Sequence, residues 1–140
     1  MKKYRVDIVV RESVYAQKVK YSVEAWLEFG APEDALNLFF RSCKNFDVSP
    51  DPTYKMAWTN KEKERTSAVR FAIKLAEALR KAGFTTEGAL VRKDWRGKLE
   101  EAIERKPQIE KLPGLSLSKT SMEIPKDLLK ILKEKATEPI

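Results

Sequence analysis

A short basic segment around a tryptophan is the part of the sequence best suited to bind an anionic polymer. It reads Arg92-Lys-Asp-Trp-Arg-Gly-Lys98, with four positive charges and one negative charge around Trp95. Cations can neutralise the phosphates of single-stranded nucleic acid, and a ring offers a face on which a base stacks for about 1–3 kcal/mol. The alternative is that Trp95 packs into the core at the start of a helix. The binding interpretation assigns phosphate contacts to Arg92, Lys93, Arg96 and Lys98.

A second aromatic and basic segment, Tyr54-Lys-Met-Ala-Trp58, is expected to form a strand that leads into a helix. If alternate residues of this strand share one face, that face holds Tyr54 and Trp58 and is either part of the core or a platform for base stacking. The cations of the strand and of the following helix would then lie beside it. The binding interpretation assigns phosphate contacts here to Lys55, Lys61, Arg65 and Arg70.

Trp26 is a third aromatic residue in an unusual place. From Lys18 to Phe29, apolar and polar residues alternate, which predicts a strand with one face in the core and one exposed. Trp26 falls on the polar face, in line with Lys20 and Ser22. A tryptophan on such a face needs a cover, which is either another helix or a ligand that stacks on it.

The composition excludes several kinds of catalytic site. The chain has one cysteine, Cys43, and no histidine, so serine–histidine and cysteine–histidine nucleophile systems and histidine-based zinc sites cannot be built. Cys43 falls in the apolar stripe of a predicted helix and is expected to be a small core residue. The glycines lack the spacing of a dinucleotide-binding or phosphate-binding loop. We therefore expect a binding protein that is not an enzyme and that holds no metal, cofactor or small-molecule substrate.

Charge and composition point to a polyanionic partner. The 140 residues carry a formal net charge of +7 at pH 7, with the largest excess in residues 61–106, and such a domain attracts polyanions. The abundance of lysine and glutamate is typical of hyperthermophile proteins. The N-terminal segment lacks the apolar core of a signal peptide, and no apolar run approaches the roughly 18 residues of a membrane span. The expected location is the cytoplasm.

The periodicity of the chain predicts an α+β domain. The expected class is an antiparallel sheet of about four strands packed with helices, plus a C-terminal helix, because the strands do not alternate regularly with helices. The expected strands cover residues 4–10, 19–29, 54–59 and 89–91, with a hairpin turn at 11–13. The expected helices cover residues 31–46, 59–83 and 94–107, the second starting at a capping box, Thr59-Asn-Lys-Glu62.

Three segments are expected along the chain. Residues 1–106 form the nucleic-acid-binding domain, residues 107–120 a linker with proline, glycine and serine, and residues 121–140 a helical segment. At about 12 residues, the last helix is marginal on its own and needs a surface on which to dock. It predicts a homo-oligomer, a dimer or a tetramer, held together by Leu128, Ile131 and Leu132.

The chain as a whole resembles a known family of DNA-binding proteins. The segment Tyr21-Ser-Val-Glu-Ala-Trp-Leu-Glu-Phe-Gly30, followed by Leu36-Asn-Leu-Phe-Phe40 and then by residues 54–70, is similar to the DNA-binding domain of the ThermoDBP-related proteins of hyperthermophilic archaea. The resemblance covers about residues 3–106. It implies an α+β domain without an OB-fold that grips single-stranded DNA in a basic, aromatic cleft and oligomerises through C-terminal elements. The founding members end in a long zipper, whereas here only a short helix after Pro125 is available.

Together these features favour a sequence-tolerant, non-OB-fold protein that binds single-stranded DNA, or RNA, by phosphate contacts and base stacking. Two other hypotheses stay open. A double-stranded DNA-binding regulator that dimerises through residues 121–136 would prefer duplex and paired half-sites. A protein-interaction adaptor, basic only because thermophile surfaces are rich in lysine, would bind no polynucleotide at moderate salt. A carboxylate-based nuclease would reveal itself by magnesium-dependent degradation.

Overall fold

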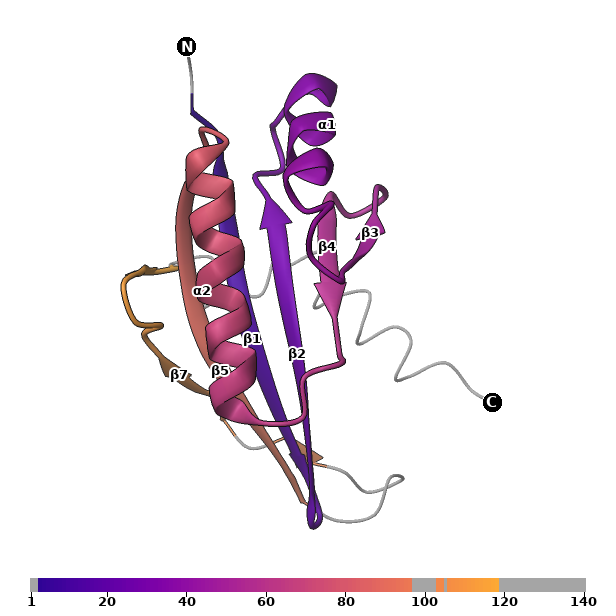
Figure 1. The fold of residues 1–140 in the computed structure, drawn as a ribbon. Coiled ribbons are helices and arrows are strands. Elements are labelled where there is room, and N and C mark those ends of the chain that lie inside the picture. The colour runs from indigo at the N-terminus through magenta and orange to yellow at the C-terminus, as the bar shows by residue number, and fades with distance from the viewer. Residues whose placement is uncertain (1–2, 97–102, 105, 119–140) are drawn as a thin grey trace.

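A mixed β-sheet with two helices against one of its faces makes up the fold (Figure 1). The computed structural model describes residues 3–96, 103–104 and 106–118. The helices are α1 (Glu33–Ser42) and α2 (Arg65–Lys81). The strands are β1 (Arg5–Tyr15), β2 (Lys18–Leu27), β3 (Ser49–Asp51), β4 (Met56–Thr59), β5 (Thr85–Arg96), β6 (Ile103–Glu104), β7 (Gln108–Glu110) and β8 (Ser116–Leu117).

The sheet runs in the order β3-β4-β2-β1-β5, and β6, β7 and β8 all pair with β5. Most neighbours are antiparallel, but β5 runs parallel to β1 along its whole length. Helix α2 explains this pairing, because it carries the chain back to the end of the sheet where β1 begins. There the Thr85 N–H donates to the Tyr4 carbonyl at 3.0 Å. The expected antiparallel sheet of four strands is therefore wrong, and the expected C-terminal helix lies outside the described residues.

The main core lies between the sheet and the two helices. Alternate residues of β1, Val6, Ile8 and Val10, point into it and are fully buried. The opposite face of the sheet, which we call the far face, carries a smaller apolar cluster formed by Val9, Ala89 and Val91, with Trp26 and Ile109 packed against it. Burial on both faces explains why the central strands β1 and β5 are rich in apolar residues.

The helix ends follow the sequence signals only in part. Helix α1 lies where the sequence pattern predicts a helix, with Glu33 and Asp34 at the positive end of its dipole, but it ends at Ser42 and not at residue 46. Helix α2 begins at Arg65, later than expected, and its N-cap residue Glu64 makes no side-chain capping hydrogen bond. The predicted capping box is wrong, because the Thr59 hydroxyl accepts a hydrogen bond from the nearby Lys61 N–H instead, at 3.3 Å. The C-terminal end of α2 agrees with the prediction, with Gly83 at φ +108°.

Strands β1 and β5 are longer than the sequence pattern predicts, whereas β2 begins one residue earlier and ends two residues earlier than expected. The hairpin turn lies at 16–17, with Ala16 at φ 54°, so β1 continues to Tyr15. Strand β5 follows it, and Trp95 pairs with Tyr15. The helix predicted from Asp94 is therefore wrong for residues 94–96 and 103–104, which are strand; its middle residues lie outside the described part of the chain. The parallel ladder to β1 supplies backbone partners that override the local helical pattern.

The segment expected as a linker contributes to the folded domain. Strands β7 and β8 pair with β5, and between them Leu112 and Leu115 enter the main core. Their methyl groups approach Gly88 closely, where a Cβ would lie 3.0 Å from each and 2.8 Å from the Ile8 carbonyl oxygen. At the end of this segment the buried Ser118 hydroxyl donates to the Asp7 carboxylate at 3.0 Å. Of the helices described, neither is long and apolar enough to cross a membrane.

Candidate nucleic-acid interface

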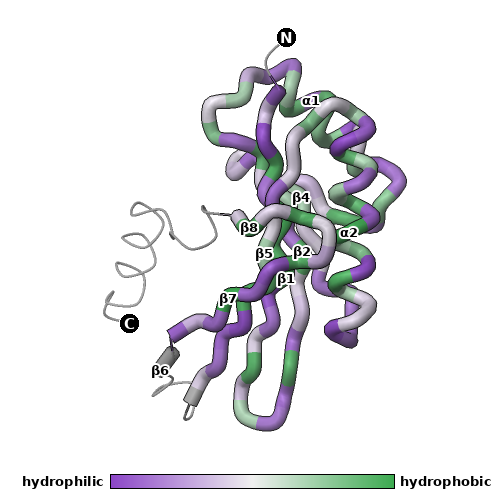
Figure 2. The backbone as a smooth tube through the Cα atoms, turned by 90° about the vertical axis from the view of Figure 1, so that its left-hand side faces the viewer, coloured by the Kyte–Doolittle hydropathy of each residue, from purple (hydrophilic) through white to green (hydrophobic). Residues whose placement is uncertain are grey.

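A projection of the sheet, built from the β1–β2 hairpin and the end of β5 with β6 paired to it, extends beyond the N-terminal end of α2 (Figures 1 and 2). We use the name finger for residues 12–20 of the β1–β2 hairpin and residues 92–96 of β5. The hairpin register runs without interruption to the pair formed by Tyr15 and Lys18. Apart from the buried Glu12, the finger residues whose side chains are described are half-buried or exposed, more so than those of the core strands. The finger is therefore a surface on which side chains can meet a ligand.

Two aromatic residues lie next to each other on the far face of the finger. Tyr15 and Trp95 are partners in the parallel ladder between β1 and β5, and residues in register share a face. Alternation from Val9 and Val91 places both on the far face. Both are half-buried. The Tyr15 hydroxyl is buried and has no hydrogen-bond partner among the described residues. A buried polar group whose hydrogen bond is unsatisfied is unusual in a folded protein.

Three lysines border this aromatic pair. Lys18 is the β2 partner of Tyr15, and Lys20 and Lys93 are the partners of Ser13 on either side of β1. All three lie on the far face by the same alternation. We call the set formed by Tyr15, Lys18, Lys20, Lys93 and Trp95 the finger patch. It combines flat rings with cations, the two groups that a single-stranded nucleic acid requires.

Trp58 lies on the same far face, nearer the middle of the sheet. It pairs with Glu24 of β2 and is 36% exposed. From Glu24 the far-face row of β2 continues to Lys18 at the tip of the finger, over about 20 Å at the usual rise per residue of a strand. Trp58 and the finger patch thus mark the two ends of one row along the sheet.

The carboxylate at the Trp58 end of this row is neutralised within the protein. Glu24 is only 8% exposed, and it accepts hydrogen bonds from Arg11 Nε at 2.5 Å, from the Ser22 hydroxyl at 3.1 Å and from Trp26 Nε1 at 3.0 Å. The ion pair with Arg11 offsets a charge that would otherwise repel a phosphate. The same network accounts for the position of Trp26. Its side chain packs against the small far-face cluster, and its Nε1 donates the hydrogen bond to Glu24.

Several cations assigned to binding from the sequence already interact with other groups of the protein itself. The Lys55 ammonium donates to the carbonyls of Phe29, at 3.1 Å, and Ala31, at 2.8 Å. Three others form ion pairs: Lys61 with Asp47, Arg65 with Glu110, and Arg92 with Glu12. A cation in such a pair can still contact a phosphate, but the carboxylate beside it lowers the net positive charge at that position.

Glu12 gives Arg92 a structural role on the helix side of the sheet. Its carboxylate is 3% exposed, and Arg92 Nη1 lies 3.3 Å from it. Burial, together with the hydrogen bond and the negative charge of Glu12, raises the pKa of Tyr21 above its ordinary value. Arg92 therefore compensates a buried negative charge, on the opposite face from its neighbour Lys93.

The remaining residues assigned from the sequence are dispersed. Tyr54 is 55% exposed in the β3–β4 turn, and Arg70 is exposed on α2. Arg96 ends β5, while Lys98 and the expected oligomerisation residues lie outside the described residues. Among the described residues of the two basic segments, the structure thus brings Lys93 and Trp95 together beside the hairpin lysines.

Three members of the finger patch, Tyr15, Lys18 and Lys20, are not among the binding residues assigned from the sequence, and Tyr15 is the one that the sequence analysis did not consider. It continues the alternation of Arg11 and Ser13, so a strand extended past the supposed turn would have placed it beside Lys18. Within the described ranges, no three side chains of the types that bind metals gather into a site. No protein-family model, curated protein or solved structure gives a significant match to the chain.

Proposed function

We propose that the protein binds single-stranded nucleic acid along the far face of its sheet. The finger patch is the observation that carries this proposal, because Tyr15 and Trp95 lie in register with each other and with Lys18, while Lys20 and Lys93 lie two residues away on the same face, beside Ser13. The two rings would stack bases, and Lys18, Lys20 and Lys93 would contact phosphates.

The length of the row from the finger patch to Trp58 supports a short binding site. About 20 Å of strand separates the two ends, which suits roughly four nucleotides, the small end of the range for single-strand-binding modules. Bases can stack on protein rings only when they are unpaired and turned outward. A duplex hides its base faces within its own stack, so this surface favours single strands.

A labelled-oligonucleotide anisotropy titration tests the proposal. Single-stranded DNA, single-stranded RNA and duplex of equal length are compared at two salt concentrations. We expect the single strands to bind more tightly than duplex, because stacking adds to the phosphate contacts. Tighter binding to duplex would instead favour a double-strand-specific regulator, and no binding to any of the three at low salt would favour a protein-interaction adaptor.

Two aromatic substitutions then locate the site. Trp95→Ala and Tyr15→Ala each remove one ring of the finger patch, and we expect each to weaken single-strand binding by about tenfold, equivalent to roughly 1–2 kcal/mol of lost stacking. Tyr54→Ala is the matched control, since Tyr54 is an exposed ring in the β3–β4 turn, away from the finger. Equal losses in all three variants would contradict a site on the finger.

A further inference from the structure

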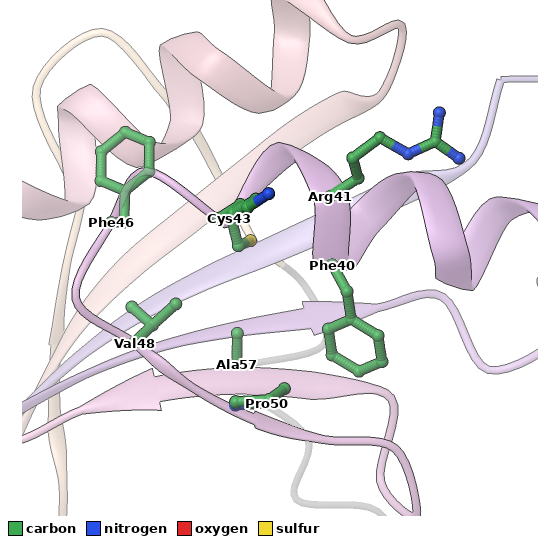
Figure 3. Close-up of a pocket in the computed structure, with 8 residues that line it drawn as sticks. Phe40, Arg41, Cys43, Phe46, Val48, Pro50 and Ala57 are labelled. Carbon is green, nitrogen blue, oxygen red and sulfur yellow. The ribbon is translucent and has the colours of Figure 1, made fainter.

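A separate apolar pocket opens between the C-terminal end of α1 and strands β3 and β4 (Figure 3). Its volume is about 380 Å³, within the lower range of small-molecule sites. Its walls are formed by Phe40, Cys43, Phe46, Val48, Pro50 and Ala57. We propose that this pocket binds a small amphipathic anion, a carboxylate carried on an apolar chain.

The walls of the pocket are apolar and held in place by the core. The Phe40 ring extends from α1 toward Pro50 and Ala57 (Figure 3), and it also packs against Phe39 with ring centroids 5.3 Å apart. On the other side the Phe46 ring meets Phe71 edge-on at 5.7 Å. Rings fixed from behind keep the space between them open, so an apolar chain can enter without displacing the core.

The cysteine in the wall does not add charge. Cys43 is 3% exposed, and burial raises the pKa of its thiol to about 12. The thiol is therefore neutral at physiological pH and behaves as a small apolar group. An apolar chain rather than a polar ring fits this interior, because the wall offers few side-chain hydrogen-bonding groups with which to hold the edge of a base or sugar.

The rim of the pocket is positively charged. Arg41 and Lys44 are exposed, and neither forms an ion pair with another described residue. Arg41 extends outward from the helix end, away from the apolar walls (Figure 3). No carboxylate lines the pocket, and the nearby Asp47 is bound to Lys61. Lys44 and Arg41 thus give the outer edge of the pocket a positive charge, which favours a carboxylate at the mouth with the chain of the ligand inside.

The pocket is independent of the proposed nucleic-acid site. Ala57 belongs to the main core, on the helix side of the sheet, whereas the finger patch lies on the far face beyond α2. Failure of one proposal therefore leaves the other unaffected. Because the two sites are separate, binding of an anion to the pocket can be measured without any polynucleotide.

Titration calorimetry with two amphiphiles of opposite charge tests the inference. Decanoate and decyltrimethylammonium carry the same apolar chain, and both are used below the concentration at which they form micelles. We expect saturable binding of decanoate, at least about tenfold tighter than that of the cation, because two rim cations favour the anion. Amide chemical shifts should change at Val48 and Ala57, which line the pocket. Absence of decanoate binding, equal affinity for both amphiphiles or shift changes confined to other regions would overturn the proposal.

A charge-removal variant provides the second measurement. Arg41→Gln combined with Lys44→Gln changes only exposed side chains, so the fold is expected to persist, and decanoate affinity should fall about tenfold. Lys74→Gln combined with Lys81→Gln removes the same charge from the exposed side of α2 and serves as the control. An equal loss in both double variants would show that net charge, and not the rim of the pocket, attracts the anion.

Discussion

Burial changes the chemistry of Cys43 in a way that pH can reveal. The pKa of its thiol is raised from 9.0 to about 12 in the folded protein, so the unfolded chain releases this proton first. The stability that the thiol contributes is therefore fully present below pH 9 and is lost as the pH rises toward 12. Between pH 8 and pH 10 we expect a loss of about 1 kcal/mol from this group.

Urea unfolding of the native protein and of Cys43→Ala, each at pH 8 and pH 10, isolates the contribution of the thiol. Lysines and tyrosines titrate in both proteins, so the difference between the two pH effects belongs to Cys43. The substitution itself lowers stability at both pH values because it removes a buried side-chain atom. A variant that loses as much stability between pH 8 and pH 10 as the native protein would contradict the assigned pKa.

Single residues also show where sequence patterns lose their predictive power. The position of Cys43 in the core follows from the helical spacing of its apolar neighbours, and the structure confirms it. The use of Lys55 could not be predicted, because the carbonyls that it binds, those of Phe29 and Ala31, come from a distant part of the sequence. The sequence around such a lysine is the same whether its ammonium group binds a phosphate or a backbone carbonyl.

At the scale of elements, the close approach of residues 111–115 to β5 depends on Gly88. A Cβ at this position would lie 2.8 Å from the Ile8 carbonyl oxygen and 3.0 Å from a methyl carbon of both Leu112 and Leu115. The carbonyl belongs to a central strand and cannot move freely. We expect Gly88→Ala to lower the free energy of unfolding by about 2 kcal/mol, the cost of overpacking, as measured by urea denaturation.

Gly30→Ala is the control for this substitution. No atom lies within 4 Å of a Cβ built at Gly30, so its stability should stay within about 0.5 kcal/mol of the native value. If Gly88→Ala were equally mild, the packing of Leu112 and Leu115 against β5 would have to be looser than the structure indicates.

The elements that the sequence predicted well are those whose pattern is set locally. Helix α1 and the alternation of β2 follow from the spacing of apolar residues, which any sequence of this pattern would share. The parallel pairing of β5 with β1 depends instead on α2 carrying the chain across the sheet, a relation between distant segments. Charged residues at 92–94 also hid the continuation of β5, so Trp95 was assigned to a helix although it pairs with Tyr15.

At the scale of the whole molecule, the net charge of +7 has to be separated from the local charge of the finger patch. A basic protein attracts any polyanion through its overall field, which salt screens at long range. Phosphates held by particular lysines instead release condensed counterions, so the logarithm of the binding constant falls by about 0.7 per contact for each unit of log salt concentration. The slope of the log binding constant against log salt concentration therefore gives the number of local phosphate contacts.

Two charge-matched double variants use this difference. With phosphate contacts from Lys18, Lys20 and Lys93, the slope of log affinity against log salt for single-stranded DNA should be about −2. Lys18→Ser combined with Lys20→Ser should reduce its magnitude to about 0.7, since two contacts are lost. Lys74→Ser combined with Lys81→Ser lowers the net charge equally, but from the exposed side of α2, and should leave the slope unchanged. Anisotropy titrations at four salt concentrations provide the slopes. If both double variants flattened the slope equally, the attraction would belong to the overall field, and the finger would lose its assigned role.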